Sequence, residues 1–177
     1  MYRDVLHCSA PRFGIAVPLA AILLGASGCG SRQESRMEQI DSLYEKHQKA
    51  FRETPEFSAD AALELQRKGQ AVFIDVREEN EQVVSMIAGA ITKKEFERAP
   101  ERYTDRVLIA YCTIGARSGE YAATKIKHGI PVSNLRGSIL SWIHAGGSIT
   151  NGGGTTTNVH VYGPEWNLIP DGYHAVW

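Results

Sequence analysis

The chain has 177 residues, of which 43% are hydrophobic and 22% are charged, and its formal net charge at pH 7 is -1. This length and composition indicate one ordinary globular domain with extensions. Acidic and basic residues are mixed along the chain without a basic block, which excludes the positive surface of a nucleic-acid-binding protein, so no nucleic acid partner is expected.

Residues 1–28 have the pattern of an export signal. Arg3 and Arg12 precede an apolar run over 13–24, and a run of small residues leads into Cys29. The apolar run is shorter than the roughly 20 residues of a membrane-spanning helix. The small residues before Cys29 resemble a bacterial lipoprotein signal, which implies that Cys29 is lipidated, becomes the first mature residue and anchors an exported protein to a membrane, facing the periplasm or the cell exterior. The alternatives are cleavage without a lipid and a cytosolic protein with an apolar N-terminal tail.

Residues 29–55 are predicted to be a helical linker. Ser35 and Glu38 have the spacing of a capping box, which indicates a helix start, and Pro55 ends the pattern. One interpretation is that an apolar stripe packs on the following domain or spaces it from the membrane; the alternative is a helix for a partner or for self-association. The stripe recurs every three or four residues, at Met37, Ile40, Tyr44, His47 and Phe51.

Residues 56–146 alternate between helix and strand patterns. Ser58 is predicted to cap the first helix, and Thr92 with Glu95 forms a capping box for a short helical turn. Such alternation predicts an α/β fold with an open parallel sheet and helices on both faces. Helices are expected over 59–68, 79–86, 118–128 and 138–145, and strands over 71–75, 107–111 and 132–135.

Cys112 lies where the apolar strand 107–111 meets a short loop before a helix. The thiolate is the reactive form of cysteine, and both a helix N-terminus and a neighbouring arginine favour it. Arg117 is that neighbour, and the loop around Gly115 can turn its backbone N–H groups inward as a small anion-binding nest. The alternative is that Cys112 is only a small buried apolar residue at the end of a strand.

Residues 147–177 are predicted to be a flexible Gly- and Thr-rich connection followed by an aromatic extension. Alternation over 158–162 predicts a strand, and Trp166, Tyr173 and Trp177 are expected to pack back over the domain. Stacking of exposed tryptophans on a glycan or another ligand is the alternative. No metal site is predicted from three histidines that lack the short paired spacing of metal ligands: His144, His160 and His174.

Four segments, in order, resemble the rhodanese (sulfurtransferase) family. Residues 112–118, Cys-Thr-Ile-Gly-Ala-Arg-Ser, resemble its active loop Cys-x-x-Gly-x-Arg-Ser. Residues 71–78 resemble its strand ending in Asp-x-Arg, and residues 87–91 resemble its Ile-Pro-Gly-Ala-Ile turn with Ala88 in place of proline. Residues 134–138 and Trp142 are similar to its Leu-x-Gly-Gly and following Trp. The resemblance covers about residues 57–145 and implies a single rhodanese-like domain without a metal or organic cofactor.

The resemblance also implies roles for individual residues. Asp75 and Arg77 would support the cysteine loop by hydrogen bonds; the alternative is that Arg77 pairs with Glu78 or Glu81 at the surface. Members that use thiosulfate often carry Arg or Lys at the two positions after the cysteine, and the neutral residues here should bind a dianion less well. The implied catalytic residues are Cys112 and Arg117, and the implied loop residues are Thr113, Ile114, Gly115, Ala116 and Ser118.

The expected function is therefore that of a sulfurtransferase. Cys112 would take a sulfane sulfur from thiosulfate, a polysulfide or a persulfide, and pass it to a thiol or to cyanide. Cys8 would leave with the signal and Cys29 would carry lipid, so Cys112 would be the only free thiol. One alternative is a non-catalytic rhodanese-like binding or sensing module. Another is a phosphatase or arsenate reductase, but these need an arginine where this chain has Ser118.

Overall fold

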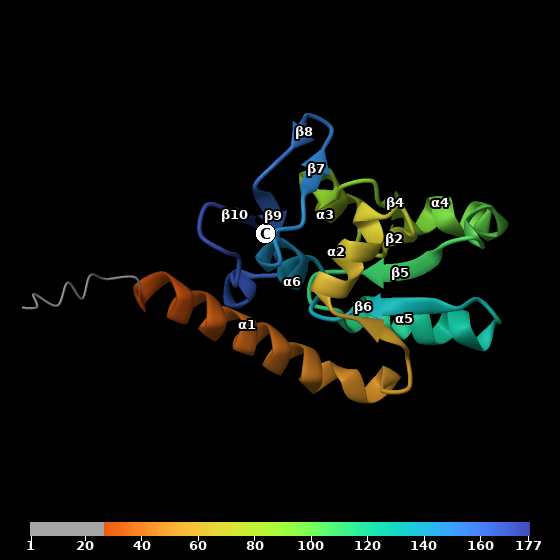
Figure 1. Cartoon of the computed structure of the whole chain (residues 1–177), viewed down its shortest axis with the longest axis horizontal. Helices are drawn as coiled ribbons and strands as arrows, with labels where there is room; N and C mark the ends of the chain where they lie inside the picture. The colour runs from red at the N-terminus through yellow and green to blue at the C-terminus, as the bar shows by residue number, and fades with distance from the viewer. Residues whose placement is uncertain (1–26) are drawn as a thin grey trace, which may run out of the picture.

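A computed structural model of the protein describes residues 27–177. Residues 1–26 of the predicted export signal therefore lie outside the described residues. Its centre is a five-stranded sheet in the order β1-β6-β5-β2-β4 (Figure 1). Every strand pair in this sheet is parallel, as the helix-strand alternation predicted. The strands are β1 (Glu56–Phe57), β2 (Ala71–Asp75), β4 (Ile91–Thr92), β5 (Val107–Tyr111) and β6 (Val132–Leu135).

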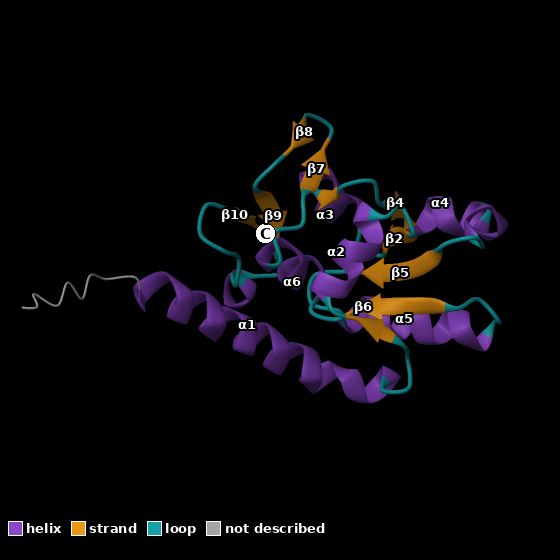
Figure 2. Cartoon of the chain, viewed as in Figure 1, coloured by secondary structure: helices purple, strands orange, loops and turns teal. Residues whose placement is uncertain are grey.

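Helices cover both faces of the sheet (Figure 2). Alternate strand residues point to opposite faces, so Phe73 and Ile109 join a core with α1, α2 and α6, whereas Ile74 and Leu108 join a core with α4 and α5. The helices are α1 (Ser27–Gln48), α2 (Ala59–Arg67), α3 (Glu79–Val84), α4 (Lys93–Arg98), α5 (Ala116–Lys127) and α6 (Ser138–His144), with short 3-10 helices η1 (Lys49–Phe51), η2 (Pro100–Tyr103) and η3 (Pro164–Trp166).

Two of the predicted helix starts are confirmed by their caps. Ser58 Oγ accepts a hydrogen bond from Ala61 N at 3.3 Å at the start of α2. Thr92 and Glu95 form the predicted reciprocal capping box of α4. The start predicted at Ser35 is wrong, because α1 already begins at Ser27 and Ser35 lies inside it.

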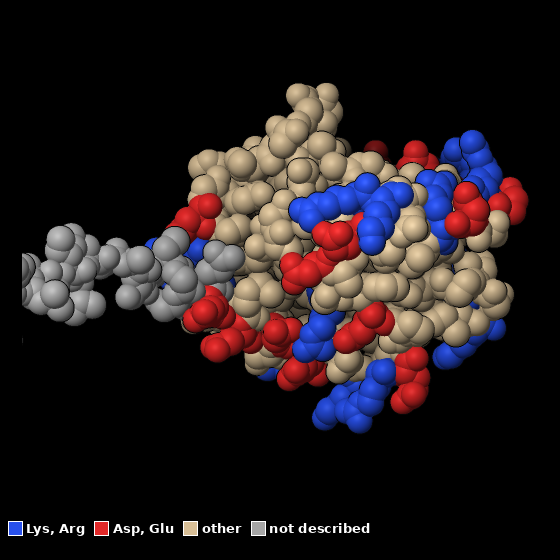
Figure 3. Space-filling view, in the orientation of Figure 1, with Lys and Arg blue, Asp and Glu red and all other residues tan. Residues whose placement is uncertain are grey.

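Helix α1 packs on the domain. Ile40 and Tyr44 of its apolar stripe are fully buried, as expected if the stripe packs on the following domain. Arg136, just after β6, forms ion pairs with Asp41 and Glu45 of α1, both at 3.1 Å. Acidic and basic side chains are interspersed over the face that Figure 3 shows. None of the helices within residues 27–177 is both long and apolar enough to span a bilayer.

The C-terminal residues fold back onto the domain instead of forming a flexible connection. An antiparallel hairpin is formed by β7 (Ile149–Asn151) and β8 (Gly154–Thr155), and its strand β7 pairs with β3 (Met86–Ile87). Because Met86 belongs to strand β3, helix α3 ends before residue 86, the predicted end of the helix. Strand β9 (Asn158–His160) pairs in parallel with β10 (His174–Val176). The fold-back is apolar, because it buries Val159, Val161, Leu168 and Ile169 in the core shared with α1, α2 and α6.

Candidate active site

Cys112 follows the last residue of β5, a strand in the interior of the sheet, and its exposed fraction is only 1%. Its backbone N donates to Ser138 Oγ at 2.9 Å. Gly115 N donates to Cys112 Sγ at 3.2 Å. Gly115 has a φ of 104°, and a Cβ there would lie 2.8 Å from the ring of Tyr44. Only glycine allows this turn, which directs its backbone N–H group at the sulfur. Gly115 is the N-cap of α5, so the helix begins at Ala116, two residues earlier than predicted.

Ser118 lies beside the same sulfur, on the first turn of α5. Its Oγ is 3.6 Å from Cys112 Sγ and 2.7 Å from Asn134 Oδ1, to which it donates. Asn134 donates in turn to the carbonyl oxygen of Gly115 at 3.0 Å. Asn134 lies on β6, so the neighbouring strand fixes both the turn at Gly115 and the position of Ser118.

Arg117 is held by a partner that the sequence did not reveal. Its two terminal nitrogens donate to the two carboxylate oxygens of Glu81 at 2.6 and 2.8 Å. One of them also donates to Thr113 Oγ1 at 3.2 Å. Glu81 is buried on α3. Burial by itself raises the pKa of Glu81, but the hydrogen bonds and charge of Arg117 and the backbone N–H of Glu78 outweigh it, so the carboxyl pKa is below its ordinary value.

The same surroundings favour the thiolate of Cys112. Burial is the largest single effect and raises its pKa, whereas the charge of Arg117 and the hydrogen bonds of Ser118 and Gly115 lower it. The lowering effects together exceed the effect of burial, so the pKa of the thiol is below its ordinary value. These effects favour the thiolate form of a buried cysteine.

Asp75 and Arg77 form a separate buried network behind the loop, in contrast to both sequence interpretations. Arg77 donates through Nε and Nη2 to Asp75, and through Nη2 to the carbonyl oxygen of Ser85. Within the described part of the chain, neither residue hydrogen-bonds to the loop 112–118, and no ion pair joins Arg77 to a glutamate. The link to the site is Tyr111, whose hydroxyl donates to Asp75 at 2.7 Å.

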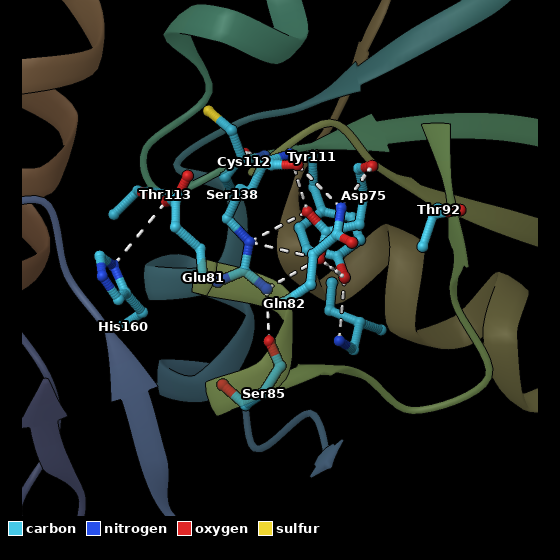
Figure 4. A network of polar contacts seen from close by, with 12 residues as sticks. Asp75, Glu81, Gln82, Ser85, Thr92, Tyr111, Cys112, Thr113, Ser138 and His160 are labelled. Atoms are coloured by element: carbon cyan, nitrogen blue, oxygen red, sulfur yellow. Dashed lines mark hydrogen bonds and ion pairs between the residues drawn. The ribbon is translucent and has the colours of Figure 1, made fainter. Parts of the chain in front are cut away.

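The physical reason lies in the strand register. Asp75 on β2 faces Tyr111 on β5, so the pair supports the residue before the cysteine and not the loop after it. The sulfur of Cys112 points away from Asp75 and Tyr111 (Figure 4).

A pocket of about 230 Å³ opens onto Cys112. Three of its lining residues, His47, Tyr162 and Trp166, come from segments far from the loop in the sequence. The others belong to the loop: Cys112, Thr113, Ile114, Ala116 and Arg117. Most of this lining is apolar. The Arg117 guanidinium carbon lies 5.9 Å from the centre of the Tyr162 ring, and the Tyr162 and Trp166 ring centres are 5.7 Å apart. Sequence reasoning did not assign these aromatic residues to the site.

The described residues contain no group of three or more His, Cys, Asp or Glu side chains arranged to hold a metal ion. Two of the histidines considered above lie near other groups. His144 Nε2 is 2.7 Å from the carbonyl oxygen of Leu168, and His160 Nδ1 is 3.9 Å from Glu81 Oε1.

Comparison with known proteins gives a family model and several solved structures. Residues 58–145 match the model of the rhodanese-like domain. A thiosulfate sulfurtransferase from Pseudomonas aeruginosa is 25% identical with a TM-score of 0.50, and the match covers 64% of this chain but only 23% of that one. A rhodanese-related protein from Thermoplasma volcanium is 23% identical with a TM-score of 0.47, and covers 54% of this chain and 97% of its own.

A protein from Rhodopseudomonas palustris, described as a possible tyrosine phosphatase, is 20% identical with a TM-score of 0.48, and covers 71% of this chain and 96% of its own. No curated protein matches the sequence.

Proposed function

Because residues 58–145 form a rhodanese-like domain, we propose that this protein is a sulfurtransferase in which Cys112 carries the transferred sulfur. The observation that carries the proposal is the environment of the sulfur. Gly115 N donates to Sγ at 3.2 Å, and the pKa of the buried thiol lies below its ordinary value. A cysteine buried in purely apolar surroundings would instead have its pKa raised.

The reaction divides into two displacements at sulfur. The Cys112 thiolate attacks the terminal sulfur of the donor, and the bond that held this sulfur breaks with its electron pair leaving on the donor remnant, which is sulfite when the donor is thiosulfate. The new persulfide is an anion near neutral pH, and the loop N–H groups with the charge of Arg117 stabilise it. An acceptor thiolate or cyanide then attacks the outer sulfur, and the electron pair returns to Cys112 Sγ.

The phosphatase alternative lacks the arginine that would bind the oxyanion. A tetrahedral oxyanion needs an arginine six positions after the cysteine, and Ser118 occupies that position with its hydroxyl donating to Asn134 at 2.7 Å. Arg117 is one residue too early in the loop and already binds both oxygens of Glu81. The binding-module alternative is distinguished by experiment.

The test is the intact mass of the full-length protein after incubation with thiosulfate and, separately, with polysulfide. We expect a gain of one sulfur atom that a reducing thiol removes and that the Cys112→Ser variant does not show. If the folded wild-type protein gains no sulfur from either donor, the domain is a binding module and the proposal is wrong.

We further propose that Cys29 carries a lipid that anchors the domain to a membrane. The apolar segment and the small residues before Cys29 support this proposal. Helix α1 would then act as a stalk, since about 1.5 Å per residue puts Cys29 roughly 16 Å along the axis from Ile40, a fully buried residue of the helix. We expect Cys29→Ser to leave a folded protein that no longer sediments with membranes. Continued sedimentation in detergent-free extracts would instead indicate an uncleaved apolar segment.

A further inference from the structure

Three of the eight residues that line the pocket at Cys112 come from outside the rhodanese-like domain. His47 lies on α1, before residues 58–145, and Tyr162 and Trp166 come from the C-terminal extension, after them. Cys112 is only 1% exposed, so a donor that reaches the sulfur through this pocket contacts the pocket lining, to which these three side chains belong. They are therefore in a position to select the donor.

The extension holds its two aromatic side chains in place. The residue before Tyr162 is the fully buried Val161, whose N donates to the carbonyl oxygen of Val176 at 2.7 Å, and the buried Leu168 follows the segment. Trp166 closes the short helix η3, where its N donates to the carbonyl oxygen of Gly163 at 3.0 Å. Tyr162 is 66% exposed, so part of its ring is free to contact a ligand.

The charge in the pocket is low for a site that is to bind a dianion. Among the lining residues that the structure describes, Arg117 is the one Arg or Lys. Both ends of its guanidinium donate to Glu81, at 2.6 and 2.8 Å. The two residues after Cys112 are neutral, and Ile114 presents only hydrocarbon. Once the thiolate forms, Arg117 is shared between two negative charges, those of the thiolate and of Glu81, which weakens its attraction for a doubly charged donor.

The size of the pocket matches one ring. An apolar cavity of about 150 Å³ holds a benzene molecule, whereas drug-sized ligands occupy roughly 300–1,000 Å³. The pocket of about 230 Å³ therefore has room for a ring and the sulfur group attached to it. Tyr and Trp rings prefer edge or offset contacts with another ring, and such contacts add to the burial of apolar surface.

We infer that Tyr162 and Trp166 are specificity-determining residues, and that they select an organic sulfane-sulfur donor that carries a ring-sized apolar substituent and at most one negative charge. This inference rests on the proposed sulfurtransferase function. Aryl thiosulfonates and aryl hydropersulfides belong to this class of donor. With a thiosulfonate, Cys112 Sγ forms a bond to the sulfane sulfur, the bond between that sulfur and the sulfonyl sulfur breaks, and the electron pair leaves with the sulfinate. The total charge of -2 is unchanged.

The experiment uses the full-length protein and three donors that transfer the same kind of sulfur: benzenethiosulfonate, methanethiosulfonate and thiosulfate. The rate of Cys112 persulfide formation is measured by mass, and is divided by the rate of each donor with a free small thiol to remove differences in intrinsic reactivity. We expect the wild type to rank the donors in the order given. In Trp166→Ala and Tyr162→Ala the rate with benzenethiosulfonate should fall about tenfold, the size expected when an aromatic contact and its buried surface are lost. The rate with thiosulfate should change less than about twofold.

Trp177→Ala is the matched control, because Trp177 is an aromatic residue of the same extension, is 63% exposed and does not line the pocket. It should leave all three rates unchanged. Tyr162→Ala removes an exposed side chain, so it tests the inference even if Trp166→Ala does not fold. If both pocket variants slow all donors equally, or if thiosulfate is the preferred wild-type donor, the inference is wrong and the sulfurtransferase proposal stands. If neither these three donors nor polysulfide sulfurates Cys112, both are wrong.

Discussion

Replacing Arg117 by alanine should raise the pKa of Cys112 and slow sulfur uptake at neutral pH. The charge of Arg117 is the leading effect that lowers this pKa, and it acts against burial, which raises it. Without Arg117, only the hydrogen bonds of Ser118 and Gly115 oppose burial. We therefore expect the pKa of the thiol to be higher in this variant than in the parent.

The magnitude follows from the contacts of Arg117. An opposite charge within about 4–6 Å lowers a pKa by roughly 1–3 units. Glu81 binds both ends of the guanidinium and offsets part of its field, so Arg117 lowers the pKa of the thiol less than an unpaired cation would. The Arg117→Ala change also leaves the Glu81 carboxylate without its partner near the sulfur, and this adds a shift of the same sign. Both changes therefore raise the pKa of Cys112.

The effect on rate is smaller than the change in the amount of thiolate. At a pH below the pKa values of both parent and variant, a rise of one unit in the thiol pKa removes about nine-tenths of the thiolate. The remaining thiolate is about threefold more nucleophilic, since the Brønsted coefficient is about 0.4–0.5. Sulfur uptake should therefore slow about threefold per unit of pKa and recover in part when the pH is raised. Arg117→Lys should restore the charge but only part of the rate, because an ammonium group lacks the planar arrangement of N–H donors by which a guanidinium binds two oxygens at once.

The assay is the pH dependence of iodoacetamide alkylation in a Cys8→Ser, Cys29→Ser background, where Cys112 is the only thiol. Arg117→Ala is also expected to lower the free energy of unfolding by roughly 1–3 kcal/mol, because the buried Glu81 loses its main hydrogen-bond donor. The double variant Glu81→Gln, Arg117→Ala is the control that removes this unpaired charge. If the midpoint of alkylation is the same in Arg117→Ala as in the parent, Arg117 does not set the pKa and the argument fails.

Two further predictions concern stability, measured by chemical denaturation. Asp75→Asn should lower the free energy of unfolding by about 3–5 kcal/mol, because it leaves the charge of the fully buried Arg77 side chain without its partner; a change below about 1 kcal/mol would show that the buried pair is not formed. Gly119→Ala should cost about 1–3 kcal/mol, since a Cβ there would lie 2.3 Å from the ring of Phe51. Gly152→Ala, where a Cβ meets nothing within 4 Å, is the matched control, and equal effects of the two would contradict the overpacking argument.

The sequence by itself determined the parts of this protein that depend on neighbours along the chain. The apolar run 107–111 forms the buried strand β5 and ends at Cys112, since a short β-branched and aliphatic run suits a strand covered on both faces. The caps at Ser58 and Thr92 were predictable because a cap joins a side chain to backbone groups only three residues away. The loop 112–118 was also predictable, because the cysteine, the glycine and the arginine that define it are neighbours along the chain.

Only the tertiary structure decided which groups surround the reactive sulfur. Glu81 and Arg117 are 36 residues apart, and nothing in their spacing marks them as a pair among the many carboxylates of the chain. The register of β2 with β5 directs Asp75 and Arg77 to Tyr111 and away from the loop. The pocket walls come from His47 and from the extension that carries Tyr162, segments that meet only because apolar surface on α1 and on the extension is buried in one core. Burial of apolar surface depends on area and not on distance along the chain, so the sequence pattern shows that these surfaces are buried but not what they are buried against.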